Sequence, residues 1–268
     1  MPEGPECRRC ALSFGDYAGG EKLTEINILS GRYLKKPLPG LKELKEDLPL
    51  LVQGVGVHGK FIYTIFENKF NLWSTLGMTG SWQKVMTNHS RVEMVFESGK
   101  VIYFNDMRNF GTLRYCRDPK LLASKLESLG PDMLALDVEN EIFISQMRKN
   151  NHHNITKILM DQSVISGVGN YIKAEALWLA RLSPHRKISD ISDSSLKILN
   201  KAIKSVMKES FVSGGATIRS YKDFFGESGN YGNRFMVYNQ KNDPDGNEVI
   251  KEKTPDGRTT HWVPEIQR

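Results

Sequence analysis

Apolar β-branched and aromatic residues gather in four short segments of the first half of the chain, and Asn, Gly and Ser turns separate these segments. This pattern predicts β-strands over residues 60–66, 70–78, 91–97 and 100–106. The sequence ESGK at 97–100 is typical of a hairpin tip. We therefore expect the first half to be mostly β, as a two-layer sandwich with helices at its ends.

Helical spacing, in which apolar residues recur every three or four positions, begins after the helix-breaking pair Gly130-Pro131. Ser192 or Asp193 is a suitable N-cap for the longest of the expected helices. The predicted helices cover residues 155–160, 171–181 and 194–211.

Strand-like segments return from residue 235 onward. Two Pro-Asp-Gly sequences, at 244–246 and 255–257, divide them and favour type I turns completed by a glycine with positive φ. The expected strands are FMVYNQ (235–240), NEVIKEK (247–253) and RTTHWV (258–263). The tail is thus predicted to be a small β-hairpin unit.

The order of these elements predicts an α+β chain in which β and helical parts are separate. We place an N-terminal β-sandwich domain at 1–128, a linker at 129–150, a helical domain at 151–234 and the hairpin unit at 235–268. The 268 residues are 39% hydrophobic and 25% charged, which excludes a disordered chain, a collagen and a coiled coil.

Several features predict an intracellular protein without a membrane partner. No run approaches the roughly 20 apolar residues that span a bilayer, and the N-terminus lacks the basic and then apolar layout of a secretory signal. The three cysteines, Cys7, Cys10 and Cys116, are too few for a disulfide framework. We therefore expect a reducing compartment and no disulfides.

The net charge of +6 is concentrated in the second half of the chain. Residues 149–268 carry 18 Lys or Arg against 13 Asp or Glu, and the sequence pI is about 9.1. A basic region of this kind attracts polyanions such as nucleic acids. The same charge also fits a plain solubility feature.

The N-terminal sequence MPEGPE offers unusual chemistry at the start of a helix expected over residues 5–20. A methionine before a small residue is normally removed, which would leave Pro2 with a secondary amine. Such an amine attacks an aldehyde-like carbon and forms an iminium ion, and Glu3 and Glu6 could act as acid and base. The same residues also suit an ordinary helix start, where Pro and Glu are favoured.

Four motifs in register carry a resemblance to a known family. Residues 2–6 (PEGPE), 76–80 (LGMTG), 105–111 (NDMRNFG) and 161–178 (DQSVISGVGNYIKAEALW) are similar to the motif set of the formamidopyrimidine-DNA glycosylase and endonuclease VIII family. The resemblance spans nearly the whole chain. It implies a bifunctional repair enzyme that excises oxidised bases from damaged double-stranded DNA and nicks the strand at the abasic site. We expect a monomer, because nothing in the sequence indicates a homodimer. It would act at DNA, in the nucleus of a eukaryote or in the cytoplasm and nucleoid of a bacterium.

The resemblance also implies roles for individual residues around the lesion. Pro2 would attack C1′ of the flipped nucleotide while Glu3 assists the opening sugar, and Glu6 would lie beside them. Lys60, taken from sequence alone as the start of a strand, would contact phosphate near the lesion. Arg258, at the hairpin tip, would hold the backbone at the damaged nucleotide.

A second group would hold the opened duplex. Flipping leaves a hole in the stack, and by the resemblance Phe110 wedges it, Arg108 faces the orphaned base and Met78 fills space; singly, Met78 and Phe110 would be typical core residues. Gly169 and Asn170 fall in the SGVGN turn of the implied helix-two-turn-helix element. There backbone N–H groups and the positive end of the next helix suit a phosphate.

The hairpin unit at 235–268 resembles the finger of the family, and it is where the sequence departs from many relatives. Val263 and Ile266 stand where the last two of four zinc-binding cysteines would fall, and residues 117–268 contain no cysteine. Four-coordinate zinc cannot be built there, so we expect no metal and no cofactor, and a zincless finger as in Nei-like 1 and plant members. The pair Cys7-x-x-Cys10 is more typical of buried core thiols, and His152-His153 of a solvated surface.

Lesion preference and two other functions stay open at this point. Residues 214–235 resemble the segment that holds the loop over 8-oxoguanine, whereas the missing zinc ligands point to the Nei-like branch. We expect activity on formamidopyrimidines, abasic sites and oxidised pyrimidines, with 8-oxoguanine undecided. A non-catalytic damaged-DNA-binding protein is the main alternative, and an RNA- or nucleosome-binding module is a weaker one because it does not explain the PEGPE start.

Overall fold

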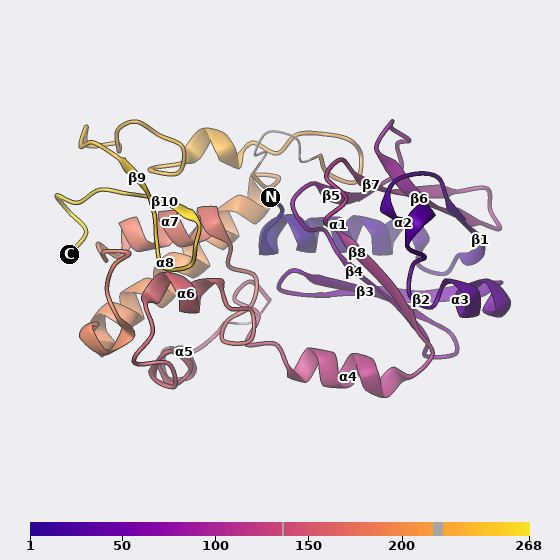
Figure 1. Ribbon diagram of the computed structural model, residues 1–268, viewed down its shortest axis with the longest axis horizontal. Helices are drawn as coiled ribbons and strands as arrows, with labels where there is room; N and C mark the ends of the chain where they lie inside the picture. Colours follow the sequence, from indigo (N-terminus) through magenta and orange to yellow (C-terminus); the bar gives the residue numbers. More distant parts are fainter. Residues whose placement is uncertain (136, 217–221) are drawn as a thin grey trace. The chain divides into compact units, whose positions relative to one another are not determined.

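The computed structural model describes residues 1–135, 137–216 and 222–268 (Figure 1). The chain divides into two compact units, one of residues 1–127 and 213–230, the other of residues 128–212 and 231–268. Each is described by itself. Within the described ranges, no helix is both long and apolar enough to cross a membrane.

The first unit is built on antiparallel strands that pair in the order β5-β7-β6-β1-β2-β3-β4-β8. Only Lys22↔Leu51 and Leu23↔Leu50 join β1 to β2, so the strands on either side of this junction form the two layers of the expected sandwich. The strands are β1 (Lys22–Ile28), β2 (Leu50–His58), β3 (Phe61–Phe66), β4 (Asn71–Thr75), β5 (Gly80–Gln83), β6 (Ser90–Phe96), β7 (Val101–Asp106) and β8 (Thr112–Cys116). The α+β class and the four strands expected from sequence are confirmed.

Helix α1 (Gly4–Ala18) contacts β2, β3 and β5 and thus strands of both layers. The Phe14 ring centroid lies 5.2 Å from that of Trp82, which lies 5.0 Å from that of Phe104. The helix ends just before the Gly19-Gly20 pair, as expected. Its Cys7 and Cys10 side chains are buried in the core. The described part of this unit also contains the short helices α2 (Arg32–Lys35), α3 (Leu41–Asp47) and α4 (Pro119–Glu127).

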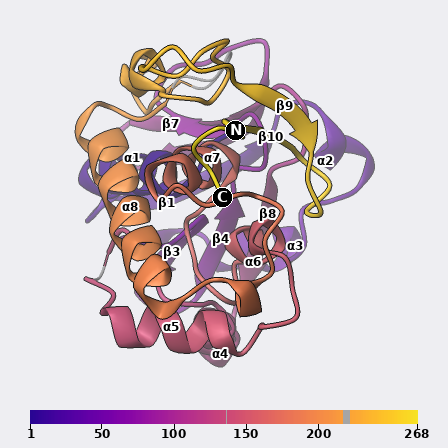
Figure 2. The same cartoon turned by 90° about the vertical axis from the view of Figure 1, so that its left-hand side faces the viewer.

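The second unit is helical, with a C-terminal hairpin. Helix α8 packs against α5 and α7 (Figure 2), and the Ser192 hydroxyl caps α8 by accepting the Ser195 N–H at 3.1 Å. The helices are α5 (Asn140–Arg148), α6 (Ile155–Met160), α7 (Asn170–Leu179) and α8 (Asp193–Val212), with short 3₁₀ turns η1 (Ile188–Asp190) and η2 (Tyr231–Arg234). Strands β9 (Ile250–Lys253) and β10 (Thr259–Trp262) pair antiparallel.

The linker predicted at residues 129–150 is wrong over its second half. Residues 140–148 form α5, whose Phe143 and Met147 are fully buried. The Asn200 side chain of α8 donates to the Val138 carbonyl at 3.0 Å. The four-residue spacing of Phe143 and Met147 is the helical signal that the prediction overlooked, and their burial makes this segment part of the core of the second unit.

The strand predicted at residues 235–240 is also wrong. The backbone N–H groups of Met236, Val237 and Tyr238 all donate to the Glu175 carboxylate, at 2.8, 3.0 and 2.7 Å. Successive N–H groups of a strand point in opposite directions, so three that converge on one carboxylate require a turn. Burial raises the pKa of Glu175, and these three donors partly offset that effect.

Both Pro-Asp-Gly turns are confirmed. The Gly246 N–H donates to the Asp243 carbonyl at 3.0 Å, and the Gly257 N–H donates to the Thr254 carbonyl at 2.8 Å. The two glycines have φ values of +90° and +77°, a conformation that favours glycine over residues with a Cβ.

Candidate active site and nucleic-acid interface

The N-terminal residues singled out for chemistry are buried at the start of α1. Pro2 is buried, and Glu3 and Glu6 are 1% and 0% exposed. The Glu3 N–H donates to Glu6 Oε2 at 2.7 Å, and the Glu3 side chain accepts the Glu6 N–H in return. This capping box sets the direction of the chain at Pro2, one residue before the N-cap.

Glu6 also joins α1 to a distant segment of the same unit. Its Oε1 accepts the Ala216 N–H at 2.7 Å. Gly215 has a φ of +88°, and a Cβ built there would lie 3.1 Å from Glu6 Cγ, so a side chain would crowd the carboxylate. Residues 214–235, the segment expected to include the loop over 8-oxoguanine, begin here. Residues 217–221 of this segment lie outside the described residues.

Lys60 lies in the tight turn between β2 and β3, not in a strand as expected. His58 pairs with Phe61 across this turn, and Gly59 has a φ of +58°, which fits a type II′ hairpin. Burial raises the pKa of Cys7, and the nearby Lys60 ammonium opposes that rise. Helix α1 contacts β2 and β3, the strands that this turn joins, so Lys60 lies near the first turn of α1, which follows the N-cap Glu3 and carries Glu6.

Met78, Arg108 and Phe110 come together on two adjacent loops, residues 76–80 and 107–111, which we call the wedge loops. Arg108 Nη1 lies 3.1 Å from Met78 Sδ, and the Arg108 guanidinium lies 4.7 Å from the centroid of the Phe110 ring. Phe110 is 52% exposed. An aromatic ring that protrudes beside a cation has the form needed to enter a base stack.

Asp106 holds the wedge loops together, and the sequence analysis did not single it out. Its carboxylate is 1% exposed and accepts the Thr79 hydroxyl at 2.5 Å and the Gly111 N–H at 2.7 Å. The Thr79 oxygen in turn accepts the Arg108 N–H at 2.9 Å. The NDMRNFG motif contained this residue, but only the fold shows that its carboxylate reaches the other loop.

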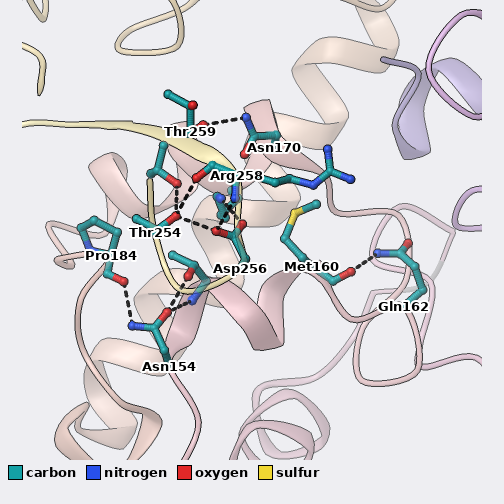
Figure 3. A network of polar contacts seen from close by, with 12 residues as sticks. Asn154, Met160, Gln162, Asn170, Pro184, Thr254, Asp256, Arg258 and Thr259 are labelled. Atoms are coloured by element: carbon teal, nitrogen blue, oxygen red, sulfur yellow. Dashed lines mark hydrogen bonds and ion pairs between the residues drawn. The ribbon is translucent and has the colours of Figure 1, made fainter. Parts of the chain in front are cut away.

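In the second unit, Asn170 is the first residue of α7, directly after the N-cap Gly169. Its side-chain amide donates to the Thr259 carbonyl at 2.9 Å, which brings the N-terminus of α7 to the β9–β10 hairpin tip that carries Arg258. Figure 3 shows the exposed Arg258 side chain running alongside Asn170. The N-terminus of α7 and the Arg258 guanidinium thus lie side by side, an arrangement that suits a phosphate.

A buried ion pair supports this arrangement and was also missed. Lys173 of α7 pairs with Asp256 in the hairpin tip, and their side chains are 0% and 3% exposed. The Thr254 hydroxyl donates to Asp256 at 2.6 Å, and the Arg258 N–H donates to it at 3.3 Å (Figure 3). Nothing in the sequence around Lys173 indicates that its partner lies 83 residues away.

Comparison with known proteins decides the family. Family models described as the N-terminal, H2TH and C-terminal domains of formamidopyrimidine-DNA glycosylase match residues 1–113, 129–222 and 230–268. The formamidopyrimidine-DNA glycosylase of Streptococcus pneumoniae serotype 4 is 30% identical over 282 residues, covering 100% of this chain and 99% of that protein. The chain belongs to the formamidopyrimidine-DNA glycosylase family. It is thus a DNA glycosylase of base excision repair.

Solved structures agree with this assignment. A Lactococcus lactis formamidopyrimidine-DNA glycosylase mutant in complex with a Fapy-dG containing DNA has a TM-score of 0.88 at 27% identity and covers 100% of both chains. The MutM protein of Thermus thermophilus has a TM-score of 0.87 at 28% identity, covering 99% of this chain and 98% of that one. The match spans both units, so the glycosylase fold is shared along the whole chain.

The finger of this glycosylase contains an apolar cluster that includes Val263 and Ile266, the two positions at which zinc-binding cysteines are missing. Val263 is fully buried and packs with Ala174, Val237 and Val249, and Ile266 lies against them. Apolar side chains cannot coordinate zinc, so the finger does not fit that metal. Among the described residues, no three His, Cys, Asp or Glu side chains are grouped to hold a metal ion.

Proposed function

We propose that this glycosylase removes oxidised bases from double-stranded DNA with Pro2 as its nucleophile and then cuts the strand by β,δ-elimination. The grouping of Pro2, Glu3, Glu6 and Lys60 at the first turn of α1 carries the proposal.

The reaction follows from the chemistry of a secondary amine. The Pro2 nitrogen forms a bond to C1′ of the flipped nucleotide, and the glycosidic bond breaks as the base leaves with its electron pair and a proton. Glu3 protonates the sugar ring oxygen as the ring opens, which leaves an iminium ion between Pro2 and C1′. The iminium withdraws electrons and makes the C2′ proton acidic. Loss of that proton breaks the C3′–O bond and releases the 3′ phosphate, and loss of the C4′ proton then breaks the C5′–O bond and releases the 5′ phosphate.

The other grouped residues would hold the DNA during this reaction. Phe110 enters the stack, Arg108 faces the orphaned base, and Met78 fills the space that the flipped nucleotide leaves. The N–H groups at Gly169 and Asn170 and the Arg258 guanidinium bind phosphates near the lesion.

The substrates we propose are formamidopyrimidines, abasic sites and oxidised pyrimidines. The Lactococcus lactis relative has been solved with DNA containing Fapy-dG and with DNA containing an oxidised pyrimidine. A MutM relative has been solved with DNA containing carbocyclic 8-oxo-G. Cleavage of matched duplexes bearing a formamidopyrimidine, thymine glycol or 8-oxoguanine will rank these lesions and decide the place of 8-oxoguanine.

Borohydride trapping on an abasic duplex tests the role of Pro2. We expect a covalent protein–DNA adduct, and mass spectrometry should find the DNA attached to the N-terminal peptide. Pro2→Gln, which removes the secondary amine and keeps Met1 attached, should give at least a hundredfold less adduct. An adduct on an internal lysine, or tight binding of the abasic duplex without any adduct, would contradict the mechanism; the second result would indicate a damaged-DNA-binding protein.

We further propose that the finger is zincless, that the enzyme is a monomer and that it acts at DNA inside the cell. The apolar cluster around Val263 supports the first point, because burial of these side chains replaces the stabilisation that metal ligation would supply. Light scattering should give a mass of 30.4 kDa, and elemental analysis should find less than one tenth of an equivalent of zinc. A stoichiometric zinc whose removal by a chelator lowers Tm would refute a zincless finger.

A further inference from the structure

A cavity of about 450 Å³ opens on the outer face of the β3-β4-β8 layer. Ile62 and Leu72 on these strands are buried in the core, whereas Phe61 and Trp73 line the cavity. Its described lining includes none of the residues assigned above to the reaction. The volume lies within the range of small-molecule sites, which is roughly 300–1,000 Å³.

Aromatic rings form one wall of the cavity. The ring centroids of Phe61 and Trp73 are 5.4 Å apart with planes at 79°, so the two rings meet edge to face, and Phe61 is 6% exposed. Tyr33 of α2 also lines the cavity. Such a surface suits a flat, conjugated ligand, because any nucleobase can stack on an aromatic face whatever its hydrogen-bonding edge.

Four cations surround these rings, and no Asp or Glu is among the described lining residues. The Arg114 guanidinium lies 5.1 Å from the Trp73 ring, the Lys125 ammonium 5.7 Å from the Phe61 ring, and Lys36 is exposed at the rim. The fourth cation, Arg32, donates to the Asn109 carbonyl of the wedge loop 107–111 at 3.3 Å. The cavity therefore combines a stacking surface with several cationic side chains.

We propose that this cavity binds a nucleotide, with the base stacked against Phe61 and Trp73 and the phosphate held by Arg114, Lys36 and Arg32. Stacking of a base is stronger than an exposed cation–π contact, so a base displaces the Arg114 guanidinium from Trp73 and the phosphate then retains it. The nucleotide is either free or a unit of a DNA strand. This binding goes beyond the proposed repair reaction and does not require Pro2.

Titration of the ¹⁵N-labelled protein with 2′-deoxyadenosine 5′-monophosphate tests the site. The indole signal of Trp73, identified by its loss in Trp73→Leu, should shift, and the Kd should be at least tenfold lower than for deoxyadenosine or inorganic phosphate. Pentadeoxyadenylate forms a second arm. If pentadeoxyadenylate shifts the Trp73 signal with a Kd at least tenfold lower than that of the mononucleotide, the site binds a DNA strand. If its Kd is equal or higher, the site binds the free nucleotide.

Neighbouring residues provide matched controls. Lys36→Ala and Arg114→Ala should each weaken binding at least threefold, whereas Lys35→Ala, an exposed lysine of α2 outside the described lining, should leave it unchanged. Pro2→Gln should bind the nucleotide like the wild type, so failure of the repair mechanism and failure of this site are separable. An unmoved Trp73 signal, equal binding of inorganic phosphate or an equal effect of Lys35→Ala would overturn the proposal.

Discussion

At the scale of single residues, the geometry of the wedge loops depends on side chains behind the exposed Phe110 ring. Asp106 accepts hydrogen bonds from Thr79 and Gly111, one on each loop. Gly77, with a φ of +59°, allows the two loops to approach, because a Cβ there would lie 2.6 Å from the Phe110 carbonyl carbon. Phe110 is thus held by its backbone while its ring stays exposed.

Phe110→Ala therefore separates DNA binding from stability. The ring is 52% exposed, so we expect the free energy of unfolding to change by no more than about 0.5 kcal/mol. The affinity for an abasic duplex should fall at least tenfold, about 1.4 kcal/mol, measured by fluorescence anisotropy. Met86→Ala, at an exposed apolar residue outside the wedge loops, is the control. An equal loss of affinity in both variants would argue against a wedge at Phe110.

At the scale of elements, α7 organises the second unit through polar side chains along its length. Asn170 donates to Thr259 beside the hairpin tip, and Lys173 pairs with Asp256 within that tip. The Glu175 carboxylate accepts hydrogen bonds from the backbone N–H groups of residues 236–238. One short helix therefore positions both the hairpin tip that carries Arg258 and the first residues of the finger.

Removing one partner of the buried ion pair tests this role of α7. Lys173→Met should lower the free energy of unfolding by about 3–5 kcal/mol, because it leaves the Asp256 charge buried without its cation. Lys204→Met, which breaks the exposed pair with Asp137, should cost no more than about 1 kcal/mol. Urea unfolding measures both losses.

The double variant Lys173→Met/Asp256→Asn removes the uncompensated charge and should recover most of the lost stability. Its affinity for DNA should stay below that of the wild type, because the hairpin tip keeps the Asn170–Thr259 hydrogen bond to α7 but loses the ion pair. Full recovery of both properties would show that the pair does not position Arg258.

At the scale of the whole molecule, charge affects both DNA binding and the dependence of stability on pH. The chain carries a net charge of +6 at pH 7, which assists association with a polyanion. Buried titratable groups decide how acid affects folding. Burial lowers the pKa of His261 in β10 from 6.5 to about 4, and the nearby Lys251 and Lys173 add to this effect.

The sign of the His261 effect predicts a loss of stability in mild acid. The unfolded chain takes up a proton near pH 6.5 and the folded chain only near pH 4, so stability falls as the pH drops between these values. At 1.36 kcal/mol per pKa unit the loss approaches about 3 kcal/mol. His261→Gln should flatten this part of the stability curve, measured by urea unfolding from pH 7 to pH 4.

His152→Gln is the matched control, since His152 is exposed. Its curve should follow that of the wild type. A wild-type stability that is constant from pH 6.5 to pH 4, or an unchanged slope in His261→Gln, would contradict a neutral, buried His261.

The sequence by itself determined what local rules can determine. Helix α1 stops before its glycine pair, both Pro-Asp-Gly turns close on glycines with positive φ, and α6 covers the residues that apolar spacing predicted. These features depend on residues within a few positions of one another. The motifs at 2–6, 76–80, 105–111 and 161–178 identified the family for the same reason, because each is a short run whose residue types are set by its chemistry.

Only the tertiary structure decided the features that depend on partners distant in sequence. Residues 235–240 make a turn because the carboxylate of Glu175 binds their N–H groups. Asp106 joins two loops, and Asp256 lies buried because Lys173 comes to it. Each depends on burial of a charged group, which is stable only when a second segment supplies its partner. No local pattern encodes which segment that is, so the sequence identified the chemistry and the fold determined how it is held.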